Sequence, residues 1–164
     1  RLKAEGLIQY EVSNFSKKGN ESRNNLLVWS GKEYLGFGAG AHSYYEGTRK
    51  GNIGSEKNYI SHLEKKILPM EFEEKLSSAQ LALEFLMLRL RSSVGVNLQE
   101  WIERFELEWG PKEERYVNSL YDQGRALKKG NHFCLTPKGM LIADRITVDM
   151  MPSNSSKKTV KLFF

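Results

Sequence analysis

The chain has few of the residues from which metal and disulfide sites are built. Among its 164 residues there is a single cysteine, Cys134, and the three histidines, His42, His62 and His132, lie far apart. One cysteine allows no internal disulfide, no thiolate zinc site and no cysteine-ligated iron–sulfur cluster within this chain. We therefore predict no metal site here. This cysteine usage suits a reducing compartment, so we expect a cytoplasmic protein.

Long apolar runs are also absent. No run approaches the roughly 20 residues that span a bilayer, so we expect no membrane partner. With 40% apolar and 27% charged residues, the composition is that of a globular protein with a core. The formal charge of +5 favours anionic partners only weakly, because the basic residues are scattered and equally suit a solvated surface.

The first residues have the pattern of a helix that is ending. Residues 1–5 fit a last helical turn, and Gly6 fits the stop that follows it. A natural protein seldom begins in this way. We therefore expect the chain to be the C-terminal part of a longer protein.

The residue pattern changes near residues 69–76, and we call this boundary between two parts of the chain the seam. Before the seam we predict a strand over 7–13, a short helix or strand over 23–29, a strand over 33–47 that loses its pattern at its glycines, a turn over 48–54 and a helix over 58–67. After it we predict helices over 77–91, 97–109 and 111–123, a hairpin around residues 130–131 and a last helix from residue 136. That order is winged-helix-like, and the first of these helices is apolar enough to be central.

The segment "GFGAGAHS", residues 36–43, places Gly36, Gly38 and Gly40 at alternate positions. It resembles a dinucleotide fingerprint only loosely, because the third glycine is misplaced and no helix pattern follows, so we exclude a Rossmann site. Two interpretations remain open. Either the unshielded amides contact a ligand, or the strand packs closely on a neighbour. His42 is accordingly either a ligand contact or a structural histidine.

Basic and aromatic residues flank this segment. Arg23 and Arg49 could hold an ordered anion, since arginine binds carboxylates bidentately, and Trp29 could stack on a flat ligand. The alternative is that these residues lie on a solvated surface or in the core.

Five motifs in order resemble one family. They are "YEVSNF" at 10–15, Arg23 and Asn25 with Trp29, "YLGFGAGAHS" at 34–43, "ALEFLMLRLRSSVGV" at 82–96 and "LTPKG" at 135–139. This pattern is similar to the C-terminal half of the oxygen-independent coproporphyrinogen III oxidase-like radical S-adenosylmethionine (SAM) proteins, in the haem-chaperone branch. The resemblance covers nearly the whole chain.

The resemblance implies an α+β fold. Residues 1–68 would be the end of a radical SAM partial (β/α) barrel, 69–149 a mostly helical winged-helix-like C-terminal domain, and 150–164 a flexible tail. It implies a 4Fe–4S cluster and SAM for the full-length parent, but no cofactor for this part, which is not expected to be an active enzyme alone.

The resemblance also implies site residues and partners. Cofactor contacts would come from Gly36, Gly38, Gly40, Ala41, His42 and Ser43, and substrate contacts from Arg23, Asn25, Trp29 and Arg49. The partners would be the N-terminal radical SAM half and a porphyrin or haem.

One departure from the family concerns haem. The branch is associated with an HNxxYW-like element whose histidine is linked to haem binding, but this chain has Asn24 and Val28 where the histidine and tyrosine would stand. Asparagine is not an effective axial ligand. Either the chain is a degenerate paralogue, or it binds porphyrin without axial ligation.

Parts of the sequence also suit other functions. The winged-helix-like order suggests a nucleic-acid-binding module, but the third helix, "PKEERYVNSLYD", has mixed charge, so we expect no nucleic-acid partner. The helical domain could instead be a docking surface for the barrel. Residues 1–68 would expose sheet edges unless they pack on the helical domain or pair with a second copy.

Overall fold

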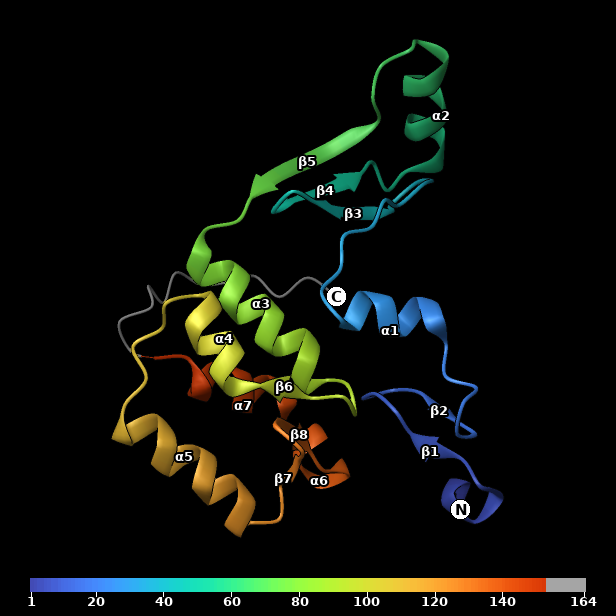
Figure 1. Cartoon of the computed structure of the whole chain (residues 1–164). Coiled ribbons are helices and arrows are strands. Elements are labelled where there is room, and N and C mark those ends of the chain that lie inside the picture. Colours follow the sequence, from blue (N-terminus) through green and yellow to red (C-terminus); the bar gives the residue numbers. More distant parts are fainter. Residues whose placement is uncertain (153–164) are drawn as a thin grey trace. The chain divides into compact units, whose positions relative to one another are not determined.

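The computed structural model describes residues 1–152, which fall into two compact units. The sheet unit is residues 32–77, and the helical unit is residues 1–31 together with the chain from Ser78 onward (Figure 1). The expected seam at 69–76 lies beside the second crossing, between Ser77 and Ser78. The first crossing, after Gly31, was not expected. The assignment of residues 1–68 to the end of a barrel stays a prediction.

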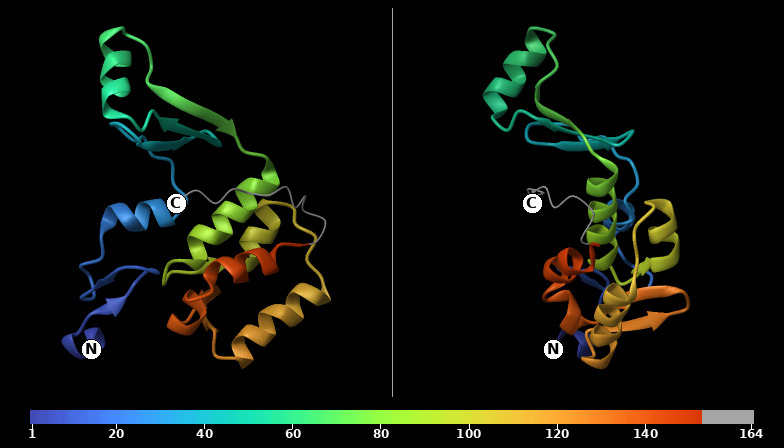
Figure 2. Two further views of the ribbon diagram at one scale, coloured as in Figure 1. Left: turned by 180° about the vertical axis from the view of Figure 1, so that it is seen from behind. Right: turned by 90° about the vertical axis from the view of Figure 1, so that its left-hand side faces the viewer.

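The helical unit holds most of the secondary structure (Figures 1 and 2). Its strands β6 (Val96–Asn97), β8 (His132–Leu135) and β7 (Ala126–Lys129) form an antiparallel sheet in that order. In chain order its elements are a 3₁₀ helix Leu2–Glu5, β1 Ile8–Gln9, β2 Phe15–Ser16, α1 Arg23–Trp29, α3 Ser78–Leu90, β6 Val96–Asn97, α4 Leu98–Arg104, α5 Pro111–Asp122, β7 Ala126–Lys129, β8 His132–Leu135, α6 Pro137–Met140 and α7 Ala143–Met150.

Three helices of this unit begin directly after a short polar side chain that caps them. The Ser22 hydroxyl accepts from the Asn25 N–H and so begins α1, which the sequence pattern alone left as helix or strand. Asn97 begins α4, and Thr136 begins α6 in the same way. The last predicted helix is divided into α6 and α7, and α4 ends at Arg104 instead of extending to residue 109.

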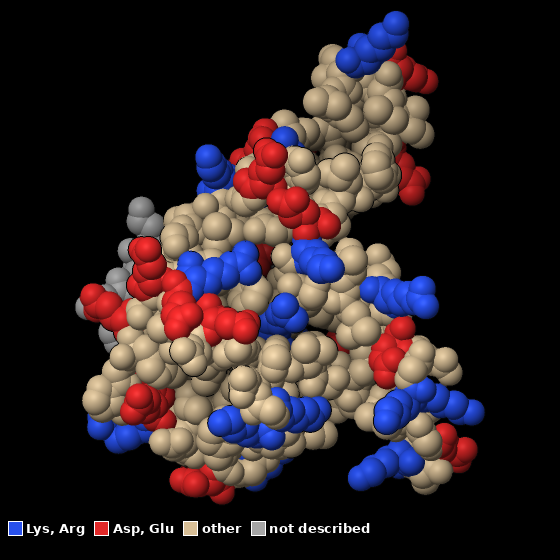
Figure 3. Space-filling model, viewed as in Figure 1, with Lys and Arg blue, Asp and Glu red and all other residues tan. Residues whose placement is uncertain are grey.

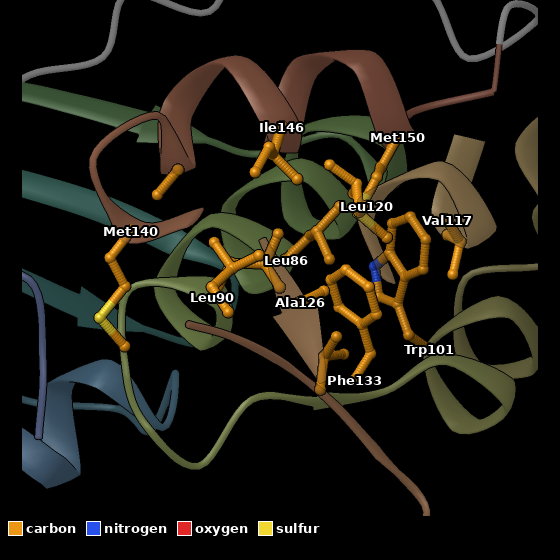
Figure 4. Packing of buried hydrophobic residues seen from close by; sticks show 13 residues of the cluster. Leu86, Leu90, Trp101, Val117, Leu120, Ala126, Phe133, Met140, Ile146 and Met150 are labelled. Carbon is orange, nitrogen blue, oxygen red and sulfur yellow. The ribbon is translucent and has the colours of Figure 1, made fainter. Parts of the chain in front are cut away.

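The core of the helical unit surrounds α3. This helix buries Ala82, Leu86, Met87 and Leu90, so the prediction of a central helix is confirmed. Side chains from α4, α5, α7 and β8 converge on it (Figure 4). Trp101 of α4 is 1% exposed, and its Nε1–H donates to the Ala82 carbonyl over 3.0 Å. The indole therefore fills volume and satisfies its polar atom at once.

The N-terminal segment is bonded to this core. The Val12 N–H donates to the Arg91 carbonyl (2.9 Å), and the Ser93 N–H donates to the Tyr10 carbonyl (2.8 Å). Tyr10 and Glu11 are buried as a result. Of the strand predicted over 7–13, only β1 is a regular strand; it pairs with β2, and Glu11, which lies between the two, bridges to Ser92.

The sheet unit is an antiparallel sheet with one helix. Its elements are β3 His42–Tyr45, β4 Thr48–Asn52, α2 Glu56–Glu64 and β5 Met70–Lys75, with strand order β3-β4-β5. The prediction of a turn over 48–54 is wrong, and β5 was missed. The reason is that "MEFEEK" reads as too charged for a strand. Its glutamates pair across strands, Glu74 with Arg49 (3.0 Å) and Glu73 with Lys50 (2.9 Å).

Two further expectations concern membrane-spanning helices and the C-terminal tail. Among residues 1–152 no helix is both long and apolar enough to cross a bilayer. The flexible tail was expected over 150–164, but Met150 is buried at the end of α7, and residues 153–164 lie outside the described part of the chain.

Gly95 and Gly124 offer a matched test of packing, because both have a left-handed φ, +71° and +64°. A Cβ on Gly95 would collide with the Phe133 carbonyl and Cys134, whereas one on Gly124 would meet no atom within 4 Å. We expect Gly124→Ala to lower the free energy of unfolding by about 1 kcal/mol, from backbone strain alone. We expect Gly95→Ala to lower it by about 3 kcal/mol, since overpacking is added. Urea unfolding of both variants checks this, and equal losses would contradict the packing described.

Candidate functional site

The glycine loop, residues 35–43, leads into β3 in the sheet unit. Its ends are tied together by two backbone hydrogen bonds between Tyr34 and Tyr44, of 2.8 and 2.9 Å. The loop therefore leaves and rejoins the sheet at one point, and the predicted long strand is interrupted there.

Each glycine has a local conformational reason. Gly38 and Gly40 have φ of +107° and +69°, which side chains disfavour. Gly36 has an ordinary φ, but a Cβ there would overlap the His42 carbonyl. A Cβ on Gly38 would meet no atom of the chain within 4 Å, so the backbone is open there.

The loop's amides are used inside the sheet unit. The Gly36 N–H donates to Ser43 Oγ (2.9 Å), the Gly38 N–H to the Tyr59 hydroxyl (3.3 Å) and the Gly40 N–H to the Ile53 carbonyl (3.0 Å). These backbone N–H groups are the ones expected, in one of the two interpretations above, to contact a ligand. Internal hydrogen bonds fix them, so the loop is well defined without a ligand. Contact of this segment with a cofactor stays a prediction.

What the loop presents outward is side chains. Phe37, between two glycines, is 87% exposed, and Leu35 is 64% exposed. His42 is exposed too, with its ring centroid 5.7 Å from that of Phe72. Ala41 and Ser43 are half-buried. The exposed surface of the loop is therefore apolar and aromatic, with one imidazole.

The predicted substrate residues are divided between the two units. Arg49 lies on β4, opposite Tyr44, and is ion-paired with Glu74. Arg23, Asn25 and Trp29 share α1 in the helical unit. Their assembly with the glycine loop around one ligand stays a prediction.

Within α1 these three residues differ in setting. Arg23 is exposed, and Asn25 is half-buried, with its backbone N–H donating to the Ser22 hydroxyl that caps the helix. Trp29 is half-buried, with its ring centroid 5.9 Å from Cζ of Arg91. That guanidinium already stacks on the indole, so one face of Trp29 is occupied.

Cys134 is a small core residue, as its neighbours in the sequence suggested. It is 0% exposed, and its Sγ–H donates to the Val94 carbonyl over 3.3 Å. Burial raises the pKa of its thiol, which opposes the thiolate that metals need. Nor do residues 1–152 gather three His, Cys, Asp or Glu side chains where a metal ion would fit. The residues present do not suit an iron–sulfur cluster.

Sequence reasoning missed the residues that hold the loop. Tyr59 comes from α2, Phe72 from β5, and Asn52 donates through Nδ2 to the Gly38 carbonyl (2.9 Å). All three are distant from the loop in sequence. Only the register of the strands and the packing of α2 beside the loop bring these three side chains to the loop.

Tyr59→Phe tests this support of the loop. Removing the hydroxyl leaves the Gly38 N–H without its acceptor, at a cost of about 1 kcal/mol. We expect amide exchange at Gly38 to accelerate severalfold while exchange in α3 is unchanged. Tyr45→Phe, which removes an exposed hydroxyl, is the matched control. Equal exchange at Gly38 in the two variants would refute the role of Tyr59.

Comparison with known proteins locates the chain in a family. Residues 76–142 match the HemN C-terminal domain. The chain is 33% identical over 146 residues to the heme chaperone HemW of Bacillus subtilis, covering 89% of this chain and 38% of that protein. It is 29% identical to the bovine mitochondrial radical S-adenosyl methionine domain-containing protein 1, covering 92% of this chain and 36% of that protein.

A solved structure agrees with these sequence relatives. The fold matches coproporphyrinogen III oxidase (HemN) from Escherichia coli, described as a radical SAM enzyme, with a TM-score of 0.68. The match has 13% identity and covers 91% of this chain and 38% of that one. The architecture is thus α+β, as the motifs implied, and the chain spans well under half the length of these relatives. The chain belongs to the HemN/HemW-like family of radical SAM proteins, of which it forms a C-terminal part.

Proposed function

We propose that this chain is the C-terminal part of a radical SAM protein that binds a porphyrin or haem. The observation that carries the proposal is its 33% identity over 146 residues to a heme chaperone. That similarity includes 89% of the chain, so it extends beyond the matched domain at 76–142 into the region with the glycine loop.

The proposal assigns the radical chemistry to another part of the protein. This chain has one cysteine, and it is buried and hydrogen-bonded in the core. The cluster and SAM would therefore be held by an N-terminal radical SAM half, which is the chain's first partner. A bound 4Fe–4S cluster supplies the electron that reduces the sulfonium of SAM. The chain alone is not catalytic under this proposal.

The chain's own contribution would be to bind and position the ligand. The glycine loop presents Phe37 and His42 on a backbone that internal hydrogen bonds hold fixed. An aromatic ring and an imidazole suit the edge of a flat, apolar macrocycle. In α1, Arg23 is exposed, and its guanidinium suits a propionate.

The departure at α1 favours binding without an axial ligand from this helix. Asn24 and Val28 lie four residues apart on α1 and so share one side of it. Asn24 is exposed, and the family's histidine would stand at an accessible position. We infer that the chain binds a porphyrin through stacking and charge, with or without iron. This separates chaperone-like binding from oxidase activity.

Docking of the chain on its partner half is compatible with this function. The sheet unit exposes large apolar side chains that normally find cover, namely Leu35, Phe37, Ile60, Leu63, Ile67, Leu68 and Phe72. A barrel half would cover them, and so would a second copy of the chain.

A nucleic-acid-binding function is less well supported. Helix α5, where a winged-helix module would place its recognition helix, has Glu113 and Glu114 in its first turn. Acidic and basic residues are interspersed on the face shown in Figure 3. Phosphate contact requires a basic surface instead.

Titration with ferric haem and with metal-free porphyrin tests the proposal. We expect both to bind the chain saturably at a one-to-one ratio and with similar affinity, because no axial ligand comes from α1. In the Asn24→His, Val28→Tyr double variant we expect haem to bind about tenfold more tightly, with a shifted Soret band, and metal-free porphyrin to be unaffected. Absorbance spectroscopy measures both.

The control is Asn118→His, which adds an exposed histidine on α5. It should leave both affinities and the Soret band unchanged. Absence of saturable binding by either ligand would remove the proposed function.

A further inference from the structure

Two arginines of the helical unit are held on one phenylalanine. Phe85 lies on α3, and Cζ of Arg89, one turn later, is 5.2 Å from its ring centroid. Cζ of Arg104, at the end of α4, is 5.1 Å from the same centroid. Arg104 also stacks on Phe105, 5.2 Å from that centroid. No sequence pattern indicates this cluster, since only the packing of α4 on α3 brings Arg104 to Phe85.

The ring between them is fixed in place. Its centroid is 5.8 Å from that of Phe105. On another side lies Gly31, where a Cβ would be 3.4 Å from the Phe85 ring. Both guanidiniums therefore rest on a support that does not move freely, and each has lost part of its side-chain freedom before any ligand arrives.

Neither guanidinium is in an ion pair with a described residue. Within residues 1–152, Arg89 and Arg104 form no ion pair and no side-chain hydrogen bond. Two other partly buried arginines do have partners, Arg49 with Glu74 and Arg91 with Asp144. The two arginines of the cluster thus keep all their N–H donors available.

The charges of the cluster are not balanced. Burial lowers the pKa of Arg89, and the charge of Arg104 lowers it further, while Glu100 acts in the opposite direction. A second nearby carboxylate, Glu103, accepts a hydrogen bond from Gln99. Two cations held close together with one opposing carboxylate form a positive site that an added anion would stabilise.

We propose that Arg89 and Arg104, stacked on Phe85, form a binding site for the carboxylate or phosphate group of a small molecule. Guanidinium is planar and its N–H groups fork, so it binds either oxyanion bidentately, and two forks can share one ligand. Because the stack fixes both groups in advance, binding loses less side-chain entropy than at an unrestrained arginine. The site does not depend on the proposed porphyrin function.

Titration of the 164-residue chain at fixed ionic strength tests the site. The probes are inorganic phosphate and succinate, followed by the Nε–Hε resonances of the arginines in two-dimensional NMR. We expect saturable shifts of the Arg89 and Arg104 resonances with at least one probe, and the probe that binds more tightly identifies the anion class. If neither probe shifts these two resonances saturably, the proposal is wrong.

Three variants separate a site from general charge. We expect Arg104→Gln to weaken binding about tenfold or more, and Arg104→Lys to weaken it severalfold, because lysine keeps the charge but loses the fork. Arg115→Gln removes the same charge from an exposed position on α5 and should change the affinity less than twofold. Arg89→Gln, which removes the second guanidinium of the cluster, should reproduce the loss. Equal effects of Arg104→Gln and Arg115→Gln would overturn the proposal.

Discussion

The burial of helix α3 is the constraint on which the helical unit depends. A helix that is apolar on most faces must be covered on several sides, and in this chain α4, α5, α7 and the β6-β8-β7 sheet cover it. The segment from residue 10 to 12 adds hydrogen bonds at its C-terminal end. The buried Trp101 indole also has its polar atom satisfied inside this core, because its N–H donates to a carbonyl of α3 itself. The elements around α3 are thus fixed by one shared apolar surface.

The sheet unit is organised differently, with little apolar burial and much backbone bonding. Its strands are rich in charge, and cross-strand ion pairs replace an apolar face. The glycine loop is held in the same way, by Ser43, Tyr59 and Asn52 acting on its backbone. The consequence is a fixed loop with exposed Phe37 and His42, a surface whose apolar side chains suit a partner or ligand. The hydrogen bonds to its backbone therefore hold the loop rigid and leave its apolar side chains exposed.

Sequence patterns predicted the helical unit better than the sheet unit. Periodicity and capping residues mark α3, α4 and α5, because a helix is specified by neighbours within one turn. Strands β4 and β5 were missed, since they pair with each other across the intervening helix α2, Arg49 with Glu74 for example. The glycine motif correctly marked an unusual backbone. The motif could not show whether its amides face a ligand, because that depends on which distant groups accept their hydrogen bonds.

By itself the sequence determined the family, through the order of its motifs, and the local starts of the helices, through Ser22, Asn97 and Thr136. It also determined that these residues cannot supply the several thiolates of a cluster by themselves, since there is one cysteine. Tertiary structure alone decided that Gly36 accommodates the His42 carbonyl, that Cys134 is buried in the core, and that Arg89 and Arg104 meet on one ring. The physical reason is range. Capping and periodicity act within a turn of helix, whereas these contacts join segments that only the packing of helices and the register of strands bring together.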